Sequence, residues 1–349
     1  MTIIAEDFEF VVGVDTHART HTFTTIHCAT GALIDTAAFP TTDAGMNRAL
    51  AWIRRRTGGE PVFAAVEGTS SYGARLTQML QTEGIDVGEV RPPSRSSRAL
   101  TGKSDPIDAE AAARSVLGRQ RDHVITPRAA GTRSALRILL AARSLLDQQR
   151  TANRNALTAL LRSTDLGVDV RASLRETQIT AIAAWRTTQA VDTLVRIARL
   201  EAKRMAMAIK NLTEQLTKNH KALAQLAEEL APGLQTIPGV GPVTAAIIIC
   251  AYSHHGRIRS EAAFAALGGV APRPASSGNT TRHRLNRSGD RQLNRAFDVI
   301  VRTRMSFDTA TKDYVARSRA AGKSNREIRR NLKRYVCRSI FRQLQTITA

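Results

Sequence analysis

The sequence has few aromatic residues, few cysteines and no long apolar run. Phe, Trp and Tyr make up 4% of its 349 residues, which does not indicate a surface that stacks bases on many aromatic rings. Cys28, Cys250 and Cys337 are far apart, which argues against disulfides and a zinc finger and fits a reducing cytoplasm. The apolar run AAIIICAY at 245–252 is too short to span a bilayer, and the N-terminus lacks an export signal. We therefore expect a cytoplasmic protein without a membrane partner.

Acidic residues are scarce relative to basic ones. Lys and Arg number 51 against 30 Asp and Glu, a formal charge of +21 and a pI near 11.2. A chain this basic is expected to bind a polyanion, of which nucleic acid is the commonest; a membrane surface is the weaker alternative. An apolar fraction of 42% and the length of the chain fit a folded protein of two or three domains.

Residues 1–120 alternate between strand-like and helix-like segments, and the first domain is expected to cover 1–130. Strands are expected at 8–15, 21–28, 32–39, 61–68 and 85–93. Helices are expected at 42–57, after the strand at 61–68 as far as Gly84, and from about 105. Three successive strands followed by alternating helix and strand predict an α/β domain, a mixed sheet flanked by helices.

The remainder of the chain is predicted to be mainly helical. Two long segments with few Gly or Pro, 133–163 and 177–230, indicate an antiparallel helical arm or coiled coil across 131–230. An ordinary helical bundle is the alternative, and the sequence does not separate the two. A third domain is expected at 231–349, with a Gly/Ser/Arg-rich loop at 268–291 and a basic helical tail from Lys312.

Four carboxylates stand at the ends of predicted elements. Asp15 and Glu67 each end a buried strand, whereas Asp105 and Asp108 lie three apart at a helix start. Pro106 suits the first helical position, so Asp105 could simply be the N-cap. Strand-end acids with a helix-borne pair are also what a site for two Mg²⁺ ions on a phosphodiester needs. Clustered carboxylates repel one another without a cation, so we favour a metal site.

The third region contains two motifs suited to phosphate. In IPGVGP, Gly239 and Gly241 resemble the hairpin of helix-hairpin-helix DNA-binding modules, although a plain interhelical turn is equally compatible. The loop at 268–291 carries arginines that can clamp phosphate: Arg273, Arg282, Arg284, Arg287 and Arg291. Ser276 and Ser277 lie between them. A serine there is either a loop hydroxyl or, beside a metal-bound phosphate, a nucleophile.

The segments GVDTH, AVEGTSSYG and KSDPIDA resemble the Asp-Glu-Asp-Asp motif of one class of bacterial insertion-sequence transposases. These recombinases have an N-terminal RNase H-like (RuvC-type) domain and are guided by a bridge RNA. The resemblance implies that Asp15, Glu67, Asp105 and Asp108 are catalytic ligands of Mg²⁺, two ions per site. The order F-A-A, G, A-P-R, S-G and R-S-G-D resembles the family's C-terminal domain and implies that Ser277 is the nucleophile, with Ser276 as the neighbouring alternative.

This resemblance implies a transposase that cuts and rejoins donor and target DNA through a 5′-phosphoserine intermediate. It further implies a homo-oligomer, from dimer to tetramer, that binds a guide RNA and associates with the bacterial nucleoid. One alternative is a metal-dependent endonuclease of the Holliday-junction type, which would use water in place of the serine. Another is a non-catalytic, basic nucleic-acid-binding protein.

Overall fold

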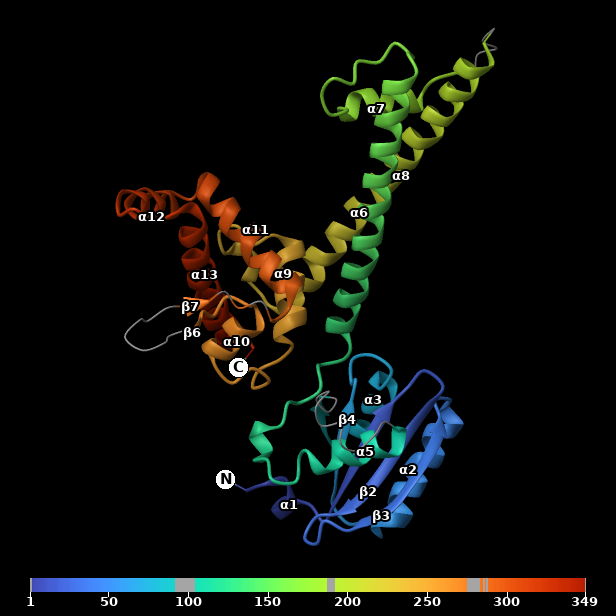
Figure 1. Ribbon diagram of the computed structural model, residues 1–349, viewed down its shortest axis with the longest axis vertical. Helices are drawn as coiled ribbons and strands as arrows, with labels where there is room; N and C mark the ends of the chain where they lie inside the picture. Colours follow the sequence, from blue (N-terminus) through green and yellow to red (C-terminus); the bar gives the residue numbers. More distant parts are fainter. Residues whose placement is uncertain are drawn as a thin grey trace. The chain divides into compact units, whose positions relative to one another are not determined.

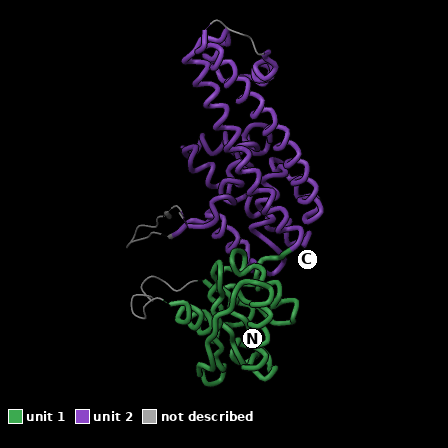
Figure 2. The backbone as a smooth tube through the Cα atoms, turned by 90° about the vertical axis from the view of Figure 1, so that its right-hand side faces the viewer, with its two compact units in different colours: residues 1–130 green, residues 131–349 purple. Residues whose placement is uncertain are grey.

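The computed structural model describes residues 2–91, 104–186, 192–274, 283–284, 286 and 288–348. The chain divides into two compact units, Met1–Ala130 and Gly131–Ala349, drawn in green and purple in Figure 2. Residues 1–130 were expected to form one domain. The sequence also predicts a boundary at residue 230, which falls inside the second unit and stays a prediction. Among the described helices, none combines the length and apolar character that crossing a membrane requires.

A five-stranded mixed sheet forms the centre of the first unit (Figure 1). Its order is β3-β2-β1-β4-β5. The pairs β1–β2 and β2–β3 are antiparallel, whereas β1–β4 and β4–β5 are parallel. The strands are β1 Phe10–Thr16, β2 Thr20–His27, β3 Leu33–Pro40, β4 Val62–Glu67 and β5 Asp86–Val90. The mixed sheet and its five strands confirm the prediction from the sequence.

Helices cover both faces of this sheet, so its central strands are buried on both sides. Successive side chains of a strand point to opposite faces. Val12 and Val14 of β1 therefore belong to the core beneath α2 and α3, while Val11 belongs to the core beneath α5. The helices of this unit are α1 Ile4–Asp7, α2 Asp43–Thr57, α3 Ala74–Thr82, α5 Asp105–Arg114 and the 3₁₀ turn η1 Arg121–His123.

Helix α5 packs unusually closely on β1. A Cβ atom added to Gly13 would lie 2.0 Å from the carbonyl oxygen of Ala109 and 2.5 Å from the amide nitrogen of Ala113. Ala109, Ala112 and Ala113 are the buried small residues of the helix that permit this approach. The alanine-rich sequence of α5 thus has a packing reason, because a larger side chain on either surface would push the helix away from the strand.

Two long helices run side by side in opposite directions at the start of the second unit (Figure 1). These are α6 Thr132–Ser163 and α8 Thr193–Leu230, which form the expected antiparallel arm. The single helical segment expected at 177–230 is wrong, because α7 Glu176–Ala183 is a separate short helix. Asp192 begins α8 by accepting a hydrogen bond from the Leu194 amide. Ile179 and Ile182 of α7 pack against α8, and this packing stabilises α7 as a helix separate from α8.

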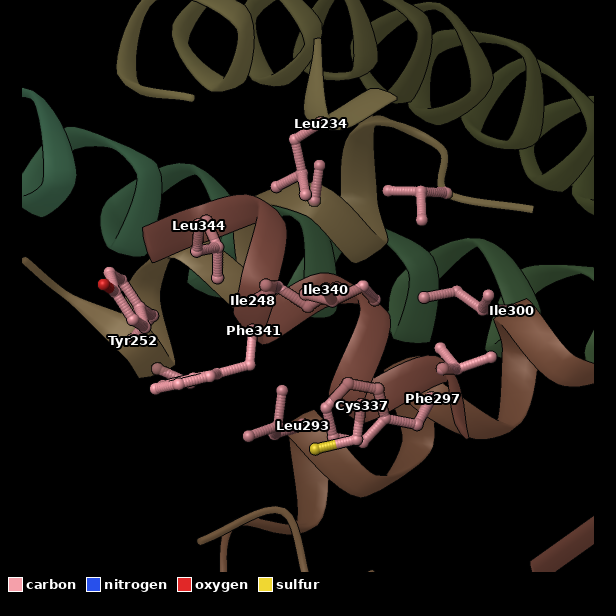
Figure 3. Close-up of a cluster of buried hydrophobic side chains, with 14 of the residues drawn as sticks. Leu234, Ile248, Tyr252, Leu293, Phe297, Ile300, Cys337, Ile340, Phe341 and Leu344 are labelled. Atoms are coloured by element: carbon pink, nitrogen blue, oxygen red, sulfur yellow. The ribbon is translucent and has the colours of Figure 1, made fainter. Parts of the chain in front are cut away.

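The C-terminal part of the second unit is helical, as expected. Tyr252, Phe297 and Phe341 belong to its core (Figure 3). The same core includes Leu136 of α6 and Leu223 of α8. The base of the arm therefore shares one core with this part. Its elements are η2 Leu234–Thr236, α9 Pro242–Tyr252, α10 Glu261–Leu267, α11 Arg291–Phe307, α12 Thr309–Ala320, α13 Asn325–Ile347 and the two-residue strands β6 Arg273–Pro274 and β7 His283–Arg284.

We predict that Gly13→Ala lowers the free energy of unfolding of the first unit by about 3 kcal/mol, the upper end for overpacking, because the new methyl group meets backbone atoms. Urea unfolding of the full chain measures this through the fluorescence of buried Trp52. The other tryptophan of the sequence, Trp185, is replaced by Phe in all samples.

Gly118→Ala is the matched control, because a Cβ there meets no atom within 4 Å and the residue has no left-handed backbone conformation. Its free energy of unfolding should stay within about 0.5 kcal/mol of the parent. Equal free energies of unfolding for the two variants would show that the first unit can accept a side chain at residue 13 without loss of stability.

Candidate active site

The ends of β1 and β4 bring two predicted carboxylates to the same face of the sheet. The parallel register pairs Gly13 with Ala65 and Val14 with Val66, so Asp15 stands next to Glu67 at the end of the two strands. Alternation along the strands assigns both side chains to the face covered by α5. The Thr16 hydroxyl donates a hydrogen bond of 2.8 Å to the Glu67 carbonyl oxygen and ties the two strand ends together.

Helix α5 supplies the other two carboxylates from its first turn. Ser104, with extended backbone angles, is the N-cap, and Asp105 is the first residue of the helix. The expectation that Asp105 is the N-cap is therefore wrong by one residue. Asp105 and Asp108 lie on one face of the helix because they are three residues apart. Asp108 is buried, whereas the Asp105 side chain is half-exposed.

His17 lies between two of these carboxylates. Its Nε2 atom is 3.0 Å from Oδ2 of Asp15 and 3.4 Å from Oδ1 of Asp105. One ligand atom of each of the three residues lies within 4.8 Å of the others, a spacing that a single metal ion can bridge. Glu67 and Asp108 are not in this tight group. The sequence analysis missed His17, although an Asp-x-His pair at a strand end is a signal for side chains on one face.

The electrostatics of Asp15 show how close the acids are. Burial raises the pKa of the Asp15 carboxyl, and the negative charges of Asp108 and Asp105 raise it further. The neighbouring His17 opposes this rise in pKa through its hydrogen bond and its charge. Asp105 and Asp108 thus each repel Asp15 near the end of β1, and a cation beside Asp15 would relieve that repulsion.

The chemistry of these side chains fits a divalent metal. Carboxylate oxygens are the ligands that Mg²⁺ prefers, and the partial exposure of Asp105 leaves room for the water that this ion retains. Asp15, Asp105 and Asp108 could hold such an ion, with Glu67 next to Asp15 on the adjacent strand. His17 could contribute a nitrogen ligand or orient the carboxylates.

The predicted residues of the serine loop fall only partly within the described part of the chain. Ser276, Ser277, Arg282 and Arg287 lie outside it, as does the side chain of Arg284. Arg273 donates a hydrogen bond of 2.8 Å to the hydroxyl of Ser288. Arg291 is exposed at the first position of α11. The roles of all these residues stay predictions.

The two predicted phosphate-binding glycines have packing and turn contacts. Gly239 has a left-handed backbone, with φ of 81°, and a Cβ there would lie 2.9 Å from the Ile300 carbonyl oxygen of α11. Gly241 is the N-cap of α9, and its amide donates a hydrogen bond to the Thr244 hydroxyl. The backbone conformation and close packing of Gly239 account for that glycine without a ligand, whereas a Cβ at Gly241 would meet no atom within 4 Å. Phosphate binding by this turn stays a prediction.

Two family models match the chain. Residues 12–165, which include Asp15, Glu67, Asp105 and Asp108, match a transposase model of the IS110 DEDD type. Residues 231–316, which include the serine loop, match the model described as the IS116/IS110/IS902 transposase family. The chain belongs to the IS110 transposase family.

Named relatives agree with this family. A protein of Sinorhizobium fredii provisionally named as transposase y4pF/y4sB is 28% identical over 67% of this chain and 59% of its own length. An uncharacterized 43.6 kDa protein of insertion element IS110 from Streptomyces coelicolor is 32% identical over 34% of this chain and 30% of its own. The matches thus span less than two thirds of the length of each of these two relatives.

We predict that Asp15→Asn stabilises the metal-free protein at neutral pH and abolishes most of its stabilisation by Mg²⁺. Because the pKa of Asp15 is raised on folding, its charge destabilises the folded state above that pKa, and the cost fades as the pH falls through it. In the wild type, Mg²⁺ at a hundred times its Kd should add about 2.7 kcal/mol. Thermal unfolding with EDTA and with Mg²⁺ measures both effects.

Asp122→Asn is the control for this experiment, since Asp122 is an exposed carboxylate in the same unit and away from the site. It should respond to Mg²⁺ as the wild type does. A Mg²⁺-induced shift of the same size in Asp15→Asn would contradict the assignment of Asp15 as a ligand.

His17→Ala should raise the pKa of the Asp15 carboxyl in metal-free protein. His17 opposes the effect of burial on this group through a hydrogen bond and its positive charge, and the variant removes both. Carbon-13 NMR titration of the aspartate carboxyl signals would measure the shift, with Asp15→Asn used to assign the resonance. An unchanged or lower pKa would mean that His17 does not act on Asp15 in solution.

Proposed function

We propose that this chain is a Mg²⁺-dependent DNA recombinase that cuts and rejoins the ends of its own insertion sequence with a serine nucleophile. The observation that carries the proposal is the convergence of Asp15, Asp105 and Asp108, with His17 among them, at the end of β1. A buried aspartate that two neighbouring carboxylates repel, on a chain of net charge +21, favours a metal-dependent reaction on a polyanion over a non-catalytic scaffold.

In this proposal, Asp15, Glu67, Asp105 and Asp108 hold the metal, with two ions per site, while Ser277 provides the attacking oxygen. When bound, Mg²⁺ would neutralise the phosphate and lower the pKa of the attacking hydroxyl. The Ser277 oxygen forms a bond to phosphorus and loses its proton, and the bond from phosphorus to the 3′ oxygen breaks. The 3′ oxygen takes up a proton as it leaves, and the 5′ phosphate stays on the serine for rejoining.

We further propose that the first unit is an RNase H-like domain of the RuvC type. Three antiparallel strands followed by two parallel strands, with helices on both faces, support this assignment. The second unit would comprise a helical arm at 131–230 and a domain at 231–349 that carries Ser277.

The arm would join protomers in a dimer or tetramer. Four apolar side chains of α8 are at least 39% exposed, namely Leu194, Ile197, Leu200 and Met207. Apolar side chains along one helix are typical of a surface that a second helix covers. An oligomer would allow the carboxylates of one protomer to act with the serine of another.

The partners in this proposal are donor and target DNA and a guide RNA. The basic composition and the few aromatic residues support binding through phosphates more than through stacked bases. A guide RNA would then select sequence by pairing, while the protein holds the backbones.

A supercoiled plasmid carrying the element's ends tests the nucleophile. Ser277→Ala should lower the cleavage rate by at least a thousandfold because no other hydroxyl would form the covalent bond. Ser276→Ala, its neighbour in sequence, should retain the wild-type rate and serves as the matched control. Mass spectrometry of a trapped complex should find the DNA adduct within residues 273–282, on Ser277.

Wild-type cleavage by Ser277→Ala would instead indicate an endonuclease that uses water, provided that Asp108→Asn is inactive in the same assay. Asp108→Asn should bind DNA as the wild type does, since phosphate contacts come from the basic residues. Loss of binding in this variant would refute that division of roles.

A further inference from the structure

A basic pocket lies in the second unit, and none of its lining residues belongs to the carboxylate site. Its volume is about 700 Å³, and its walls come from the loop 268–272, Asn286, residues 288–290, the start of α11 and the first half of α13. Figure 1 shows α11 and α13 in the C-terminal part of the chain together with β6 and β7. Of the residues predicted from the sequence to contact phosphate, only Arg291 lines this pocket, so α13 contributes residues without an assigned role.

Charge is unevenly balanced in this pocket. Six basic side chains line it against three acidic ones. Each acid already has a local partner: Asp290 accepts hydrogen bonds from the amides of Gln292 and Leu293, and Glu327 accepts them from Ser324. Asp298 binds Arg329 and Lys333. The acids therefore organise the pocket and leave an excess of positive charge in it.

The floor of the pocket is held in place by these ion pairs. Arg329 donates two hydrogen bonds to the Asp298 carboxylate, of 2.6 and 2.8 Å. Lys333 lies 3.1 Å from the same carboxylate and 3.2 Å from the Asn294 side-chain oxygen. Asn294 in turn donates to the Gly268 carbonyl oxygen at 2.7 Å. The loop 268–272 is thereby fixed to α11 and α13 as a wall of small residues.

Three further arginines, Arg291, Arg326 and Arg330, line the same pocket and are exposed; we name them the rim arginines. Within the described part of the chain, none of the three forms an ion pair with a carboxylate. Arg326 and Arg330 are four residues apart on α13 and share one face of the helix. The positive charges of the rim arginines repel one another, and an anion bound between them would remove this electrostatic repulsion.

We propose that the basic pocket binds the phosphodiester backbone of a nucleic-acid strand through the rim arginines. Guanidinium groups bind phosphate oxygens in pairs, and a wall of small residues permits close approach of the strand. The inference rests on the proposed function, because it assumes that the protein handles nucleic acid. It adds residues of α13 to the predicted phosphate contacts, at a pocket that both ends of the loop 268–291 help to line.

The test is fluorescence anisotropy of the full chain in EDTA with labelled 20-mers of one sequence, as single-stranded DNA, duplex DNA and RNA. Arg326→Gln/Arg330→Gln should weaken binding about tenfold or more at 0.1 M salt. It should also lower the slope of log affinity against log salt by about 1 to 2, as expected for two lost phosphate contacts. Arg291→Gln, from a different element, should weaken binding in the same direction.

Lys312→Gln/Arg317→Gln is the matched control. It removes the same charge from exposed positions of α12 that do not line the pocket, and its affinity should stay within about twofold of the wild type. Thermal unfolding of all variants, compared with the wild type, shows that the fold is retained.

The outcomes separate this inference from the proposed function. If the wild type binds none of the three polymers, the proposed function fails. If the wild type binds but the pocket variants bind equally well, or lose no more than the control, the pocket inference alone is overturned. A loss confined to RNA or confined to DNA supports the pocket and identifies the strand that it holds.

Discussion

The close contact between Gly13 and α5 is the constraint on which the candidate site depends. Because Gly13 has no side chain, the backbone of α5 lies so close to β1 that a methyl group at residue 13 would clash with it. This contact sets the position of the first turn of the helix, and with it Asp105 and Asp108, relative to Asp15 on the strand. Strand-borne and helix-borne acids can act on one metal only if the two elements are held this closely and rigidly.

The acids themselves work against the fold in the absence of a cation. Burial and two neighbouring carboxylates raise the pKa of Asp15, and His17 offsets part of that effect. Such an arrangement costs stability, which natural proteins tolerate chiefly where a ligand or a reaction needs the groups together. The tight β1–α5 packing and the core on the other face of the sheet supply the stability that offsets it.

The basic charge of the second unit is organised in a different way. Asp298 forms ion pairs with Arg329 and Lys333, and Glu261 forms one with Arg334. These three cations therefore stabilise the packing of the helices. The rim arginines have no such role and stay available to a polyanion. The formal charge of +21 in the sequence therefore overstates the number of cations available for binding, because part of it is used inside the fold.

The sequence by itself determined the five strands and the helical character of the second unit, and it predicted four carboxylates as metal ligands. Alternation, helical periodicity and polar residues at element ends are local patterns that survive in the folded chain. Only the tertiary structure decided the place of His17, the break between α7 and α8, and the packing of Gly239 against α11. The basic pocket likewise unites α13 with the loop 268–272 and the start of α11. These features arise from contacts between residues distant in the chain, and no local pattern specifies which distant surfaces meet.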